Sequence, residues 1–148
     1  MTALNIISLQ EAKDFLVVDY PDRDVEISRH IKSAIGFIET YTNVIMYERQ
    51  TVYLMTSNCR EIYDAPIKFA NPVIKTKQNI LSVTVFGTQN DIIDAIIGYD
   101  DVSKVPGQLI EAAYKMLQYL FDNHDIYTAG LPWDIQMMCN PYRRSSTF

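Results

Sequence analysis

One stretch of the sequence, residues 106–123 (PGQLIEAAYKMLQYLFDN), predicts a helix with unusually little polar surface. Its polar side chains recur every three or four residues and form one narrow stripe, at Gln108, Glu111, Lys115, Gln118 and Asp122. A helix on the surface of a small domain normally has one apolar stripe and one broad polar face. This helix must therefore be covered on more than one side, which constrains any fold that the chain can adopt.

The remaining positions of this helix form two adjoining apolar stripes. The first stripe is Leu109, Ala113, Met116 and Leu120, and the second is Ile110, Tyr114, Leu117 and Phe121. Either the helix is central to its own domain, or the second stripe contacts a neighbouring subunit, because exposed apolar patches on soluble proteins tend to mark interfaces. The second stripe is therefore the candidate subunit interface.

A second candidate apolar surface lies near the C-terminus, at Trp133, Met137 and Met138. Tryptophan and methionine are enriched at the centres of protein interfaces. The alternative is that the methionines fill gaps in the core of the chain itself.

The N-terminal third predicts two helices. Ser8 and Glu11 have the spacing of a capping box, which starts a short helix that runs to about Val17. Asp22 or Asp24 is placed to cap the next helix. That helix has apolar side chains at helical spacing, namely Ile27, Ile31, Ala34, Ile35, Ile38 and Tyr41.

Residues 44–99 are rich in Val, Ile, Thr, Tyr and Phe, which favours β-structure. The candidate strands are Gln50–Thr56, Glu61–Ile67, Leu81–Phe86 and Ile92–Ile97. Gly87–Asp91 has the composition of a hairpin loop between the last two. We expect one small antiparallel sheet, inserted between helices.

The C-terminal third predicts the long helix and one short helix. Ser103 is a candidate cap for the long helix, and Pro106 fits its first turn. A last helical segment runs from Trp133 to about Asn140. The predicted fold is α+β and mainly α: two N-terminal helices, one long central helix and one short C-terminal helix, with the inserted sheet. We expect a single domain, 1–148, divided into 1–43, 44–100, 103–124 and 131–148.

Composition excludes several classes of function. The 148 residues carry a net charge of −5, which argues against a broad non-specific grip on nucleic acid. No apolar run is long enough to span a bilayer, and the N-terminus lacks the basic start of a secretory signal, so we expect assembly in a cytosol. Cys59 and Cys139 lack metal-ligand spacing and are expected to stay reduced.

The sequence contains no recognisable catalytic motif. It lacks a phosphate-binding glycine loop, HExxH, GxSxG and zinc-ligand spacing. His124 lies among acidic residues, but a histidine at the end of a helix is more simply explained by capping. Paired aspartates, at 91 and 94 and at 100 and 101, fit solvated turns better than a divalent-ion site. We therefore expect no catalytic residues, no cofactor and no metal site.

Three segments in order resemble the head–tail connector proteins, or adaptors, of tailed phages. They are ISLQEAKDFLVVDYPDRDVEISRHIKSAIGFIETYT, VPGQLIEAAYKMLQYLFDNHDIY and LPWDIQMMCNPYRR. The matching positions are Leu9, Glu11, Ala12, Lys13, Leu16, Asp19, Asp24, Ile27, Ile31, Ala34, Ile38, Glu39, Tyr41 and Thr42; Pro106, Ile110, Ala113, Leu117, Leu120, Phe121 and Asn123; and Leu131, Pro132, Ile135, Met138, Pro141, Tyr142 and Arg143.

The resemblance implies a structural virion protein, not an enzyme. Such adaptors form a ring, commonly of twelve copies, beneath the portal at the head–tail junction. The ring extends the DNA channel, lets DNA pass without specific binding, and provides the platform for a neck or tail protein. Assembly in the bacterial cytoplasm is implied as well. The C-terminal segment of the family reaches toward the portal, which gives the candidate docking residues Trp133, Pro141, Tyr142, Arg143, Arg144 and Phe148.

Two alternatives remain open at this point. One is another phage neck or tail completion protein, a stopper or terminator, whose members are mostly β. The other is a small enzyme or regulator that uses His124 and its neighbouring acids.

Overall fold

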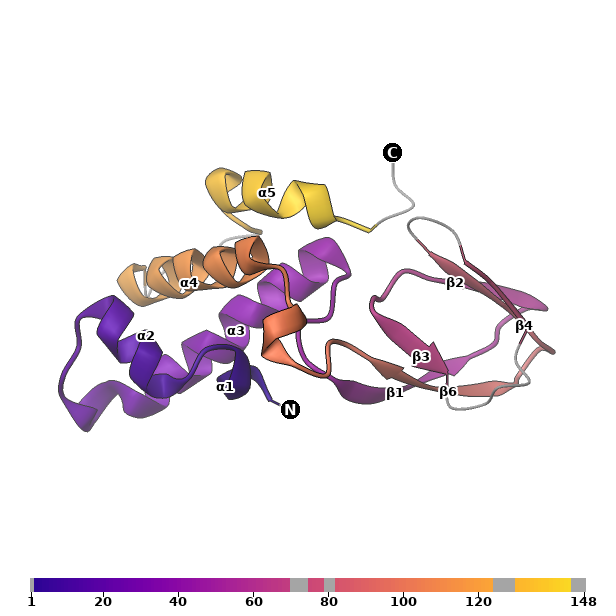
Figure 1. Cartoon of the computed structure of the whole chain (residues 1–148), viewed down its shortest axis with the longest axis horizontal. Coiled ribbons are helices and arrows are strands. Elements are labelled where there is room, and N and C mark those ends of the chain that lie inside the picture. The colour runs from indigo at the N-terminus through magenta and orange to yellow at the C-terminus, as the bar shows by residue number, and fades with distance from the viewer. Residues whose placement is uncertain (1, 70–74, 79–81, 124–129, 145–148) are drawn as a thin grey trace.

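The computed structural model describes residues 2–69, 75–78, 82–123 and 130–144. The chain has two parts that lie side by side along its longest axis, a helical body and a β part (Figure 1). The β part is inserted between the third and fourth helices. The predicted fold class, α+β and mainly α with an inserted antiparallel β-structure, is confirmed.

Among the described residues, the helical body contains five helices: α1 (Ala3–Ile6), α2 (Leu9–Leu16), α3 (Asp24–Thr42), α4 (Gly107–Asp122) and α5 (Trp133–Cys139). Short 3₁₀ turns lie at Pro21–Arg23 (η1), Val102–Lys104 (η2) and Asn140–Tyr142 (η3). Helix α4 packs between α3 and α5, and α2 contacts its side (Figure 1). The sequence did not predict α1, because four residues are too few to show a helical period.

The start of α2 is confirmed as a capping box. The Glu11 N–H donates to Ser8 Oγ at 3.2 Å, and the Ser8 N–H donates to Glu11 Oε2 at 2.9 Å. These two bonds satisfy backbone donors that a helix start otherwise leaves without partners.

The caps predicted for α3 and α4 are wrong. Arg23 occupies the cap position of α3 without a side-chain bond, and the Asp24 carboxylate accepts instead from Lys13 Nζ at 2.7 Å, which ties α3 to α2. Helix α4 begins after Pro106, also without a side-chain cap. Ser103 lies in the separate turn η2, where its N–H donates to the Asp101 carboxylate at 2.8 Å.

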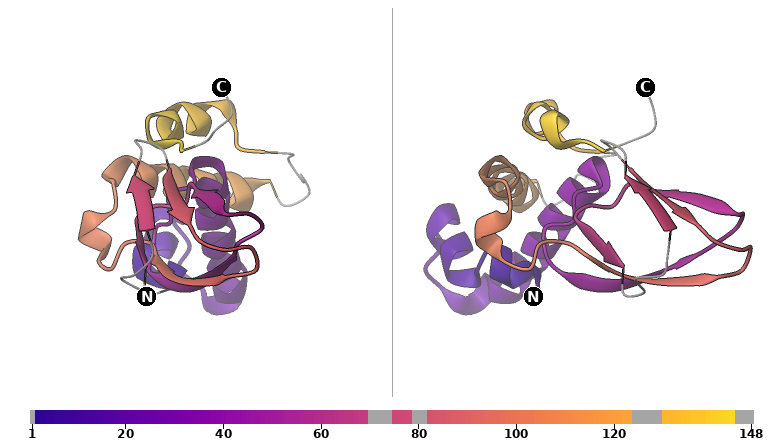
Figure 2. Two further views of the ribbon diagram at one scale, coloured as in Figure 1. Left: turned by 90° about the vertical axis from the view of Figure 1, so that its right-hand side faces the viewer. Right: turned by 45° about the vertical axis from the view of Figure 1, so that its right-hand side comes forward.

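In the part of the chain that the structure describes, the β part forms two three-stranded antiparallel sheets rather than one. The first has the order β1 (Arg49–Leu54), β6 (Ile92–Ile97), β3 (Ile67–Phe69), and the second has the order β2 (Cys59–Ile62), β5 (Val83–Phe86), β4 (Lys75–Gln78). The sheets form two layers (Figure 2) around one apolar cluster that includes Tyr53, Met55, Ile62, Val85 and Ile93. Each sheet is too small to bury its apolar face alone, so the two cover each other.

The predicted hairpin at Gly87–Asp91 is wrong, because β5 and β6 belong to different sheets. The loop crosses from one layer to the other and is held by the Asn90 N–H, which donates to the Met55 carbonyl at 2.8 Å. The predicted strand Glu61–Ile67 is also divided, since β2 ends at Ile62 and β3 begins at Ile67. Pro66 stands in the gap and has no N–H for a strand ladder.

Candidate interaction surfaces

The second apolar stripe of α4 is mostly covered by the chain's own helices. Leu117 is 0% exposed and lies in the core of the helical body, so its predicted place in a subunit interface is wrong. Ile110, Tyr114 and Phe121 are half-buried.

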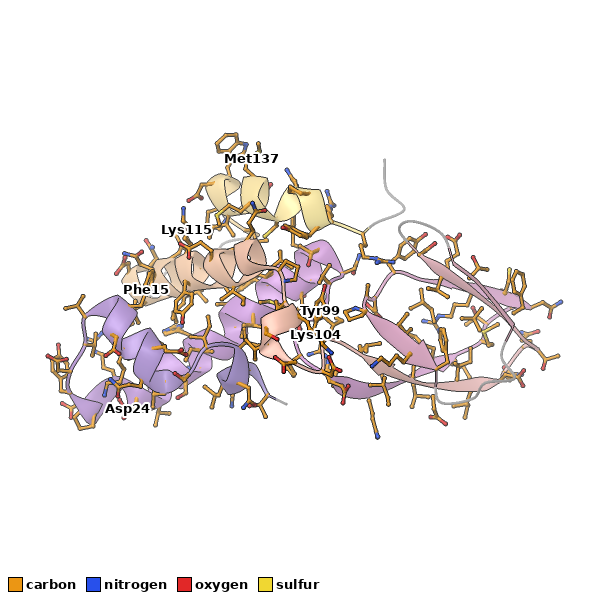
Figure 3. All side chains as sticks on the ribbon, viewed as in Figure 1. Phe15, Asp24, Tyr99, Lys104, Lys115 and Met137 are labelled. Atoms are coloured by element: carbon orange, nitrogen blue, oxygen red, sulfur yellow. The ribbon has the colours of Figure 1, made fainter. Side chains whose placement is uncertain are left out.

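Aromatic contacts explain this coverage. The ring of Tyr114 lies 5.0 Å from that of Phe15 on α2, which points toward α4 (Figure 3). The Arg23 guanidinium lies over the Phe121 ring at 5.4 Å. The exposed remainders of Ile110, Tyr114 and Phe121 stay a predicted subunit contact.

The C-terminal segment is anchored on the end of α3. The Tyr41 hydroxyl donates to Asn140 Oδ1 at 2.7 Å, and the Arg143 guanidinium lies 4.8 Å from the centre of the Tyr41 ring. The Arg144 N–H donates to the Thr42 carbonyl at 2.7 Å, and Asn43 Nδ2 donates to the Arg144 carbonyl. Contacts within the chain therefore hold this segment against the end of α3 up to Arg144.

The predicted portal-docking residues differ in exposure. Trp133, Pro141 and Arg143 are exposed, whereas Tyr142 and Arg144 are half-buried. Phe148 lies outside the described residues, as does His124.

A buried carboxylate joins the two parts of the molecule, and the sequence did not predict it. Glu39 on α3 accepts from the Met46 N–H at 2.7 Å and from Arg49 Nη2 at 2.8 Å. Arg49 opens β1 and also lies over the Tyr47 ring. Sequence periodicity places Glu39 off the apolar stripe of α3 and carries no signal of this burial.

Burial raises the pKa of Glu39, and this effect outweighs the lowering by the Met46 N–H and by Arg49. At pH values between 4.5 and the raised pKa, the Glu39 carboxyl is therefore protonated in the folded state and ionised in the unfolded state. As the pH rises from 4.5 through the folded pKa, this group's contribution to the free energy of unfolding decreases.

We expect Glu39→Gln to remove that pH-dependent contribution, because glutamine keeps an acceptor for the Met46 N–H but does not titrate. The test is urea unfolding of both proteins between pH 4.5 and neutral pH. The difference in unfolding free energy, wild type minus variant, should fall as pH rises. A difference that stays constant with pH would contradict the assignment.

The described residues contain no grouped metal ligands and two free cysteines. Among residues 2–69, 75–78, 82–123 and 130–144, no three His, Cys, Asp or Glu side chains are grouped to hold a metal ion. Cys59 is exposed and Cys139 is buried, and both are free thiols.

No protein-family model matches the sequence, and no curated protein matches it. Solved structures do match its fold. The chain is similar over 100% of its length to 95% of a chain in a structure described as the neck of an empty gene transfer agent (GTA) particle computed with C6 symmetry, with a TM-score of 0.72 and 16% identity. Its fold is that of a chain in a GTA neck.

Two further structures agree with this match. One is described as the virion of a native GTA particle, where 97% of this chain matches 92% of that chain with a TM-score of 0.74 and 14% identity. The other is described as the neck of a native GTA particle computed with C12 symmetry, where 100% matches 95% with a TM-score of 0.70 and 16% identity. The similarity covers the helical body and the β part together.

Large apolar side chains are exposed on several surfaces of the molecule. Phe15, Val17 and Tyr20 are exposed at the end of α2 and in the connection to α3, and Phe86 is exposed on β5. Trp133 and Met137 lie one turn apart on α5. Val52, Leu54 and Ile92 gather on the outer face of β1 and β6, where Leu54 and Ile92 are direct cross-strand partners. Val25 stands alone on α3. No described helix is long and apolar enough to cross a membrane.

Proposed function

We propose that this chain is a head–tail connector (adaptor) subunit, a structural and non-enzymatic component of the neck of a phage-like particle. The observation that carries the proposal is the match of the whole chain, at a TM-score of 0.72, to a chain in a GTA neck. The resemblance of its two ends to phage connectors supports the same assignment.

In this proposal, residues 1–148 act as one connector domain, and identical copies form a ring of twelve beneath the portal. The C12 symmetry used for one similar neck supports that number. The ring extends the DNA channel and carries the next neck or tail protein. A net charge of −5 suits a channel wall, because acidic side chains repel phosphates and do not trap the passing DNA. The protein is then part of the virion and is assembled in the cytoplasm of the host bacterium.

The portal-facing element is proposed to be the segment after α5, with Pro141, Tyr142, Arg143 and Arg144 followed by Phe148. Its anchoring on Tyr41 and Thr42 supports this role, because a preordered segment loses less conformational entropy on binding. The alternative stopper or terminator class is less well supported, since helical residues outnumber strand residues in the described chain.

The direct test is to add the purified protein to tailless heads or to isolated portal rings of the same particle, followed by electron microscopy. We expect an additional ring of density on the tail-facing side of the portal. Portals that stay bare at saturating protein concentration would overturn the proposal, whatever the free protein does in solution.

We expect Arg143→Glu to weaken docking on the portal by roughly 10-fold, because it reverses an exposed charge in the docking segment. The matched control is Lys68→Glu, which reverses an exposed charge on β3 instead of one in that segment. Titration of labelled protein onto portal rings measures both. Equal effects of the two reversals would assign the loss to net charge and would exclude a specific role for Arg143.

A further inference from the structure

Two exposed faces of the helical body have complementary chemistry. We define the α5 face as Trp133, Asp134 and Met137, and the α3 face as Val25, Arg29 and Lys32. Met137 on the α5 face and Asp24, which adjoins the α3 face, lie on opposite sides of the helical body (Figure 3). The two faces therefore cannot meet within one copy of the chain.

The α5 face is an apolar projection with one negative charge. Trp133 is 74% exposed and Met137 is 52% exposed, and their spacing of four residues places them on one side of the helix. Asp134 is exposed beside them in the first turn. An exposed tryptophan and methionine pair is unfavourable in water and is typical of the centre of an interface.

The α3 face is a shallow, open surface of one helix, with an exposed valine and two positively charged side chains. Val25 is 83% exposed, and Asp24 and Ser28 adjoin the face on the same helix. Lys13 already pairs with Asp24. Neither Arg29 nor Lys32 forms an ion pair with any residue that the structure describes.

Each face supplies what the other lacks. Trp133 and Met137 would cover Val25, and Asp134 would meet the positive charge of Arg29 and Lys32. The Arg29 guanidinium could also lie over the Trp133 ring, an arrangement that stabilises many interfaces. Two different faces on opposite sides of a subunit form a head-to-tail contact, which is what a closed ring requires.

We propose that the α5 face of one copy of this chain binds to the α3 face of the next copy. This inference rests on the proposed ring function and identifies the contact between neighbouring subunits of that ring. In this proposal Trp133 contacts the neighbouring subunit and not the portal. The segment after α5 remains the proposed portal-docking element.

The test is cross-linking of cysteine pairs in rings assembled on portals. The background is Cys59→Ser, because Cys59 is the exposed thiol of the two cysteines and Cys139 is buried. Val25→Cys and Met137→Cys are then introduced together, and the rings are treated with a short bismaleimide. Both positions are exposed, so the substitutions should leave the fold intact, which circular dichroism checks. We expect a ladder of covalent multimers, and no ladder from either single substitution.

The matched control is Ile92→Cys with Met137→Cys, since Ile92 is also a largely exposed apolar residue but lies on the β part. We expect no ladder from this pair. A second test pair, Ser28→Cys with Met137→Cys, probes the same side of α3 one turn further along. It keeps Val25 in place, so it still reports the contact if the Val25→Cys substitution itself weakens binding.

The outcomes separate the two proposals. Rings that are visible by electron microscopy but give no ladder with either test pair overturn the α5–α3 contact and leave the connector function standing. Cross-linking of Met137→Cys to the portal instead of to a neighbour overturns the contact in the same way. Failure of the wild-type protein to form rings on portals overturns both.

Discussion

Gly98→Ala is expected to lower the free energy of unfolding by about 3 kcal/mol or more. Gly98 has a φ of +99°, which a residue with a Cβ rarely adopts. A Cβ at this position would also overlap the backbone carbonyl of Tyr47 and lie 2.9 Å from the Glu48 nitrogen. Both neighbours are backbone atoms, so rotation of a side chain cannot relieve the overlap.

Gly98 stands where the chain leaves β6 and returns to the helical body, and its N–H donates to the Pro66 carbonyl at 2.8 Å. Urea unfolding measures the loss, with Gly36→Ala as the matched control. A Cβ at Gly36 meets nothing within 4 Å, and alanine there should stabilise α3 by about 0.5–1 kcal/mol. If Gly98→Ala and Gly36→Ala had the same free energy of unfolding, the predicted overlap between a Cβ at position 98 and the Tyr47 carbonyl would be contradicted.

Leu117→Ala is expected to destabilise the isolated protomer by about 2–5 kcal/mol, because it leaves a cavity in the core of the helical body. The half-buried Ile110 on the same helix provides the comparison. Ile110→Ala removes less buried surface and should cost about 1–2 kcal/mol. Chemical unfolding of the two variants as monomers gives both values.

The opposite pattern would return Leu117 to a subunit interface. In that case Leu117→Ala would leave the stability of the monomer unchanged while it abolished assembly into rings. The experiment therefore decides whether the second stripe of α4 serves folding or assembly.

Local patterns predicted the helices well. The capping box at Ser8 and Glu11 formed as predicted, and the apolar stripe from Ile27 to Ile38 is buried in α3. Such features depend on residues three or four positions apart, whose contacts follow from helix geometry alone. The cap predicted for α3 is wrong because a residue on another helix competes for the capping side chain. The Asp24 carboxylate accepts from Lys13 Nζ and not from the start of α3.

The arrangement of the β part and the candidate site were less predictable. Gly87–Asp91 has the composition of a hairpin loop, yet β5 pairs with β2 and β4 while β6 pairs with β1 and β3. Strand partners are chosen by how two sheets can bury one shared core, and a single loop does not encode that choice. For the same reason the burial of Glu39 could not be read from spacing alone.

The sequence by itself determined that residues 106–123 form a helix in need of cover on two sides, because side-chain spacing along a helix depends only on backbone geometry. Only the tertiary structure decided what provides that cover: α3 and α5 on opposite sides, with Phe15 and Arg23 on the second stripe. Burial of an apolar face requires segments far apart in the chain to meet, and their meeting leaves Trp133 and Met137 as the exposed apolar residues of α5.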